Sequence, residues 1–219
     1  MASDWLVWQV VDSAFPTGAF AHSWGLEAAW QQGEIQDRGA LRGFLDAAIQ
    51  QAGCAALPLA TAAYRAPERV CELDALDDAC LLNAVANRAS RIQGRTLVAT
   101  AARVWPSPAL VRIQRDAASG TAHVAPFSGA TFAALGLSLR TTQQVLLFAT
   151  ARGVLSAAVR LGIVGSYEAQ QLQVECGEQL DDVLAACADL DERHLTQTAP
   201  ILDLLQAGHD RLYSRLFQS

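Results

Sequence analysis

Apolar residues recur at intervals of three and four along most of the chain, and long alternating stretches of Val, Ile and Thr are missing from it. This spacing places apolar side chains on one face of an α-helix, whereas alternation would place them on one face of a strand. Alanine and leucine, both strong helix formers, dominate the sequence. We therefore predict an all-α protein, a single domain over residues 1–219 folded as a bundle of roughly eight to ten helices.

Prolines, glycines and capping residues divide this pattern into elements. The expected helices are Asp4–Val11, 23–33, 37–53, a short helix that ends before Pro67, 74–104, a helix from 141 or 142 to 165, one from 166 toward 187, and a tail helix over about 200–219. The helix over 74–104 is expected to be the longest. The polar stretch 119–126 is predicted to be a loop between two helical halves.

Composition excludes several classes of partner. The net charge is −6 and the sequence pI is near 5.1, so the chain lacks the basic field of a nucleic-acid binder. No apolar run reaches the ~20 residues of a membrane-spanning helix. The five cysteines are odd in number and form no CxxC pair, which suits buried thiols in a reducing compartment. We expect a cytoplasmic protein that binds neither nucleic acid nor membrane.

Motifs of catalysis and metal binding are missing from the sequence. It contains no GxxxxGK[ST], GxGxxG, HExxH or GxSxG string. The four histidines lie far apart, and none is three or four residues from another histidine or a cysteine. We assign no catalytic residue and no metal ligand. One alternative stays open, a small helical enzyme that uses His22 and Glu27, which lie close together in the sequence.

The stretch from Asp12 to Glu27 joins two predicted helices through a turn that Pro16 and Gly18 favour. A rigid interhelical elbow would justify most of its residues. The string D-S-x-F-P-x-G-x-F-x-H-S-x-G-L-E, however, resembles the N-terminal signature of UreF, a family of urease accessory proteins.

Three further blocks resemble UreF in the same order along the chain. The string R-x-S-R-x-Q-G-R holds Arg88, Arg91 and Arg95 on one helical stripe, which is either a solvated face or a patch for carboxylates. The string S-A-A-V-R-L-G holds Arg160, and Gln170 follows it. This block fits either ordinary internal packing or a close approach of another helix.

The last block, H-x-x-x-Y-S-R-L-F-x-S, begins at His209 and runs to the final residue. A terminal helix with an apolar face either packs on its own domain or inserts into a groove of a partner. The resemblance favours the second hypothesis, because UreF uses this segment to engage the accessory protein called UreD or UreH.

The resemblance to UreF implies a homodimer that binds UreD/UreH and the GTPase UreG, acts on apo-urease, and is required for nickel insertion. It implies that the chain is not an enzyme and binds no cofactor stably, since nickel is handled by the complex. A direct nickel-binding metallochaperone stays open as an alternative. The N-terminal segment (about 1–22) and the C-terminal helix are expected to engage partners. The expected partner-binding residues are His22, Glu27, Arg88, Arg91, Arg95, Arg160, Gln170, His209, Tyr213, Arg215, Leu216 and Phe217.

Overall fold

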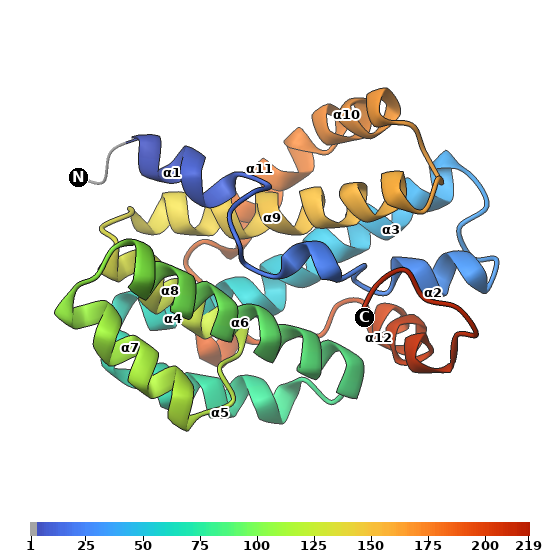
Figure 1. Cartoon of the computed structure of the whole chain (residues 1–219). Helices are drawn as coiled ribbons and strands as arrows, with labels where there is room; N and C mark the ends of the chain where they lie inside the picture. The colour runs from blue at the N-terminus through green and yellow to red at the C-terminus, as the bar shows by residue number, and fades with distance from the viewer. Residues whose placement is uncertain (1–3) are drawn as a thin grey trace.

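The structure is a computed structural model that describes residues 4–219, and its regular elements there are helices (Figure 1). The α-helices are α1 (Asp4–Val11), α2 (Leu26–Gln31), α3 (Arg38–Gln51), α4 (Leu57–Arg65), α5 (Val70–Cys80), α6 (Ala84–Val104), α7 (Pro108–Ser119), α8 (Val124–Ala134), α9 (Leu139–Arg160), α10 (Ser166–Glu175), α11 (Gly177–Cys187) and α12 (Pro200–Ala207). The all-α prediction is confirmed, with more helices than expected. The first three residues of the predicted N-terminal segment lie outside the described range.

Helix α9 lies at the centre of the arrangement (Figure 1). It packs against α3, α4, α8, α10 and α11. Two main apolar clusters result. One joins α3, α9, α10 and α11 and includes Leu45, Val154 and Leu172. The other joins α4 to α8 around the fully buried Phe127, and it includes Leu59.

A glycine allows the close contact between α4 and α8. A Cβ atom on Gly129 would lie 2.0 Å from the backbone oxygen of Ala60. No side chain fits at that distance, so glycine is what permits the two backbones to approach.

The helix predicted over 37–53 begins as expected but does not end at Gly53. Asp37 caps α3, because its Oδ1 accepts the Ala40 N–H at 2.8 Å. The helix then continues through a π turn, Ala52–Ala56, directly into α4. A Cβ on Gly53 would lie 2.2 Å from Val183 Cγ1, so this glycine serves the packing of α11 and does not stop the helix.

The single long helix predicted over 74–104 is wrong. The chain breaks after α5, and Asn83 starts α6 by accepting the N–H groups of Val85 and Ala86 at 2.9 and 3.3 Å. With 22 residues, α9 is longer than α6, which has 21. The sequence pattern does not identify Asn83 as an N-cap, because apolar periodicity continues on both sides of it.

Other boundaries differ by a few residues. The predicted loop over 119–126 is shorter, since α8 already begins at Val124. Ser138, and not Thr141 or Thr142, caps α9 by accepting the Thr141 N–H at 3.0 Å. The helix ends at Arg160 and not at the predicted residue 165. Gly162, just after this end, adopts the left-handed conformation that commonly terminates a helix.

The remaining boundary predictions have mixed outcomes. The segment from 166 toward 187 forms two helices, α10 and α11, where one was expected. The second helix of the chain begins at Leu26, and not at the predicted Ser23 cap. The end of the first helix at Val11, the start at Pro200 and the end of α4 before Pro67 are confirmed. Within residues 4–219, no helix combines the length and apolarity needed to cross a bilayer.

Replacing Gly129 with alanine tests the α4–α8 contact. We expect Gly129→Ala to lower the free energy of unfolding by about 3 kcal/mol, because the new methyl group must push two backbones apart. Gly43→Ala is the matched control. Nothing lies within 4 Å of a Cβ at Gly43 in α3, so alanine there should stabilise the helix by about 1 kcal/mol. Urea unfolding measures both, and equal effects would contradict the packing role.

Candidate partner-binding site

The C-terminal segment does not form the helix predicted over 200–219. Helix α12 ends at Ala207, and after a 3₁₀ turn, His209–Arg211, the chain continues without regular structure. In Figure 1 this last stretch returns to the segment that precedes α2. We call residues 212–219 the tail. The backbone N–H groups of Leu216, Phe217 and Gln218 donate to Glu27 and Ala21 of the N-terminal half, and not to carbonyls one helical turn earlier. The helical pattern therefore fails here.

The carboxylate of Glu27 holds the tail. Glu27 as a whole is only 1% exposed. Oε1 accepts the Leu216 N–H at 2.6 Å, and Oε2 accepts the Phe217 N–H at 3.1 Å. The buried His209 ring lies against the same carboxylate, with Nε2 at 3.1 Å from Oε2. A buried carboxylate is tolerated only when such donors compensate it, so Glu27 and the tail require each other.

A second set of bonds fixes the end of the tail. The backbone oxygen of Ser219 accepts the N–H of Ser23 at 2.6 Å and its hydroxyl at 2.9 Å. The Gln218 N–H donates to the Ala21 oxygen at 2.8 Å, and Ser219 Oγ lies 2.5 Å from His22 Nδ1. The structure therefore unites the first and last of the four sequence blocks in one buried network.

His22 is neutral in this network. Burial, and next the charge of Arg88 and the neighbouring His209, lower its pKa from 6.5 to about 4. Because the unfolded chain binds a proton that folded His22 refuses, this group destabilises the fold progressively as pH falls from 6.5 toward 4. At neutral pH the ring is an uncharged hydrogen-bonding partner of the tail.

Arg160 also belongs to the tail network. Its Nη1 donates to the Phe20 backbone oxygen. Its guanidinium carbon lies 3.9 Å from the centroid of the Phe20 ring and 4.1 Å from that of Phe217. Cations attract aromatic faces, so Arg160 links α9 to both chain segments. The Arg160 guanidinium, which we predict to bind a partner, thus already makes contacts to Phe20 and Phe217 of the same chain.

The tail directs several side chains outward. Tyr213 is fully exposed, and Leu216 is 53% exposed. We call Tyr213 and Leu216 the tail surface. Arg215 is also exposed, and its Nη1 lies 3.3 Å from Asp210 Oδ1.

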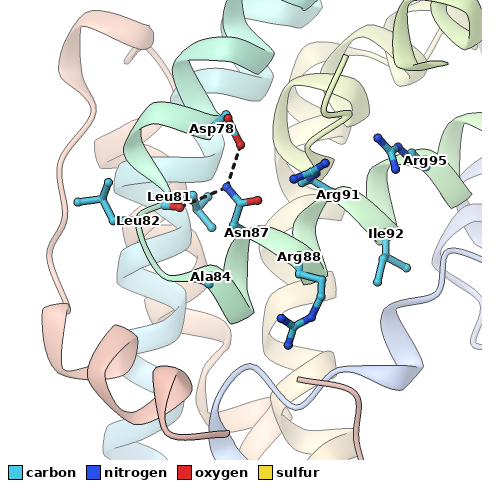
Figure 2. A pocket seen from close by; sticks show the side chains of 9 residues that line it. All are labelled: Asp78, Leu81, Leu82, Ala84, Asn87, Arg88, Arg91, Ile92 and Arg95. Atoms are coloured by element: carbon cyan, nitrogen blue, oxygen red, sulfur yellow. Dashed lines mark hydrogen bonds between the residues drawn. The ribbon is translucent and has the colours of Figure 1, made fainter. Parts of the chain in front are cut away.

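The arginine stripe lines a separate open pocket of about 600 Å³ on α6 (Figure 2). Arg88 donates to both carboxylate oxygens of Asp210 at 2.8 and 3.1 Å. Arg95 donates to the Gly120 oxygen at 3.3 Å. Arg91 makes no hydrogen bond or ion pair to the described residues. We call this site the arginine pocket. Arg91 lines it together with Asp78, whose pKa is lowered by hydrogen bonds from Asn87 and His123 and also by the charge of Arg91.

Gln170 lies apart from both surfaces. It is exposed on α10, which packs against α9 and α11 and lies at the opposite end of Figure 1 from α12. The structure therefore does not bring Gln170 together with the other predicted residues. In the predicted N-terminal segment, Trp5 and Trp8 on α1 are exposed while Val10 is buried.

Sequence reasoning missed several members of the network. Ser23 and Ser219 lie inside the recognised strings, but only the structure shows that they bond to each other. Nothing in the sequence pointed to Asp210 as the partner of Arg88. Among residues 4–219, no group of three or more His, Cys, Asp or Glu side chains is arranged to hold a metal ion.

Comparisons with known proteins support the resemblance. The family model described as UreF matches residues 35–177. "Urease accessory protein F" of Arabidopsis thaliana is 37% identical over 221 residues, which cover 98% of this chain and 92% of that protein. This chain belongs to the UreF family.

Other relatives extend the same likeness. "Urease accessory protein F" of Oryza sativa subsp. indica is 36% identical over 97% of this chain and 84% of that protein. "Urease accessory protein UreF" of Trichodesmium erythraeum is 30% identical over 95% of this chain and 94% of that protein. The Glu27 network lies outside the segment that the UreF model matches, whereas these relatives align over nearly the whole chain.

Glu27→Gln tests whether the carboxylate holds the tail in this UreF protein. An uncharged amide binds the two tail N–H groups less strongly, so we expect a loss of about 2 kcal/mol in the free energy of unfolding. Hydrogen exchange at Leu216 and Phe217 should accelerate by at least about tenfold, because local opening becomes easier. The exposed Glu34→Gln is the control. Unchanged exchange at the two amides would contradict the assignment.

Proposed function

We propose that this UreF protein is a non-catalytic scaffold of urease maturation in the cytoplasm. It binds UreD/UreH, recruits or modulates the GTPase UreG, and thereby supports nickel insertion into apo-urease, acting as a homodimer. Membership of the family and relatives named as urease accessory proteins support the proposal. Nickel is the cargo of the complex, and the chain needs no resident cofactor for this role.

The observation that carries the proposal is the way in which the tail is held. The bonds to Glu27 use backbone N–H groups, so they order the tail without consuming its exposed side chains. Aromatic and large apolar groups on an ordered segment are typical anchors of protein interfaces. We assign the tail surface to UreD/UreH.

The arginine pocket suits the second partner. Arg91 makes no hydrogen bond to the described residues and lies beside the apolar Ile92, and Arg88 is paired only through an exposed contact with Asp210. Guanidinium groups bind carboxylates through two parallel hydrogen bonds. We assign this pocket to acidic side chains of UreG.

The buried network also bears on the alternative that His22 and Glu27 form an enzyme site. Glu27 is bonded to two backbone N–H groups and lies against His209, and it is almost fully buried. Both oxygens are therefore committed to the tail. This supports a structural role for the carboxylate and a scaffold role for the chain.

Removing the exposed side chains of the tail tests the UreD/UreH assignment. The double variant Tyr213→Ala/Leu216→Ala should weaken binding by at least about 30-fold, because the loss of even one interface anchor typically costs about 2 kcal/mol or more. The melting temperature should stay unchanged, since both groups are exposed. Calorimetric titration with purified UreD/UreH measures the affinity. Tyr167→Ala/Val174→Ala on α10 is the matched control, and equal affinity of both variants would refute the assignment.

Co-expression with the urease structural and accessory genes tests the function and the arginine pocket together. Without this chain, urease should be produced with little nickel and little activity. Arg91→Glu should reduce nickel content and activity by at least about tenfold, because reversing a charge in a paired contact typically costs 2 to 5 kcal/mol.

Arg112→Glu, an exposed arginine on α7, is the control and should support full activity. Normal urease activity without the chain would overturn the proposed function. Equal activity of the Arg91 and Arg112 variants would overturn only the pocket assignment.

A further inference from the structure

Two cysteines that are far apart in the sequence meet beside the α3–α4 junction. Cys54 lies in the π turn, Ala52–Ala56, and Cys187 is the last residue of α11. Their sulfur atoms are 4.0 Å apart. Cys187 is buried, whereas Cys54 is partly exposed.

The backbone at this point is built for close approach. Gly53 precedes Cys54, and a Cβ there would lie 2.2 Å from Val183 Cγ1 and 3.3 Å from Cys187 Sγ. The lack of a side chain at Gly53 is what lets α11 reach the turn. A π turn inside a helix is itself uncommon and is frequently found at functional sites.

We propose that Cys54 and Cys187 are a site of reversible oxidation, at which a peroxide or a small-molecule disulfide converts the two thiols into an intramolecular disulfide. With hydrogen peroxide, the Cys54 thiolate attacks one oxygen, the O–O bond breaks, and a sulfenic acid and water form. The Cys187 sulfur then attacks Cys54 Sγ and displaces the hydroxyl group as water. In total, two thiols and one peroxide give one disulfide and two waters.

The surroundings assign different roles to the two thiols. Cys54 is the more exposed of the two, so an oxidant from solvent reaches its sulfur first, and the Gln50 amide donates to that sulfur at 3.4 Å. Burial, and next the neighbouring Cys54, raise the pKa of the Cys187 thiol to about 11. Cys54 is therefore the attacking group, and Cys187 resolves the sulfenic acid once the Cys54 charge has gone.

The disulfide would restrain the connection between α11 and α12, which leads to the tail. Residues 188–199 follow Cys187 and lead into α12. This connection already contacts the same junction, since the Thr196 N–H donates to the Cys54 oxygen at 3.1 Å. Gln51 Oε1 accepts the N–H groups of Thr198 and Ala199 at 2.7 and 3.0 Å. Oxidation would add a covalent bond at the start of a segment that is otherwise held by hydrogen bonds.

Such a pair suits a cytoplasmic protein. Disulfides in that compartment are usually transient and serve redox sensing or catalysis. Forming the bond requires the sulfurs to approach from 4.0 Å to about 2.05 Å. Among residues 4–219, no other pair of cysteine sulfurs lies within hydrogen-bond distance. Cys71 and Cys80 are exposed, and Cys176 is buried.

The test uses the full chain with Cys71→Ser and Cys80→Ser, which removes exposed thiols that would link two molecules. The protein is treated with hydrogen peroxide or oxidised glutathione, alkylated, and digested without reduction. Mass spectrometry should find one peptide pair joined through Cys54 and Cys187, and dithiothreitol should release it. The melting temperature should rise by about 5 °C or more on oxidation, because closing so long a loop restricts the unfolded chain.

Two further variants control the result. Cys54→Ser should abolish both the cross-link and the rise in melting temperature, and its partial exposure makes the substitution tolerable. Cys176→Ser should leave both unchanged. The inference is overturned if Cys54 is recovered as a sulfinic acid or a glutathione adduct while Cys187 stays free. It is equally overturned if both thiols remain unmodified under conditions that oxidise Cys71 in the unsubstituted chain.

Discussion

The buried carboxylate of Glu27 determines the conformation of the C-terminal end. A charge that is removed from water this fully costs several kcal/mol unless hydrogen bonds and an opposite charge or dipole compensate it. The compensating groups are His209 and the N–H groups of Leu216 and Phe217. Helix α2 and the tail are therefore mutually dependent, although nearly the whole chain separates them in sequence.

Because Glu27 binds the tail through backbone N–H groups, the side chains of the tail remain free to face the solvent or the core. Phe217 is buried against Arg160, while its neighbour Leu216 faces solvent. The interaction that stabilises the monomer thus also fixes which side chains a partner meets. An ordered segment of this kind loses less conformational freedom on binding than a disordered one would.

Local signals in the sequence predicted the helical class and several boundaries, because caps such as Asp37 act within one turn. The failures have tertiary causes. The pattern predicts a helix end at Gly53, whereas contact with α11 requires the glycine. The pattern also predicts a helix in the tail, because periodicity cannot reveal that a distant carboxylate binds its N–H groups. The UreF strings located His22 and Glu27 but not their partners.

The arginine stripe shows the same limit. The sequence gives no reason to distinguish Arg88, Arg91 and Arg95, whereas in the structure their hydrogen-bond partners differ. Asp210 bonds to Arg88 and lies near Arg215, so one carboxylate joins the arginine pocket to the tail. These groups are exposed, and such pairs typically contribute about 1 kcal/mol or less. Because the exposed pairs contribute so little, the position of the tail depends on the buried bonds to Glu27, and a partner could replace the surface pairs without releasing it.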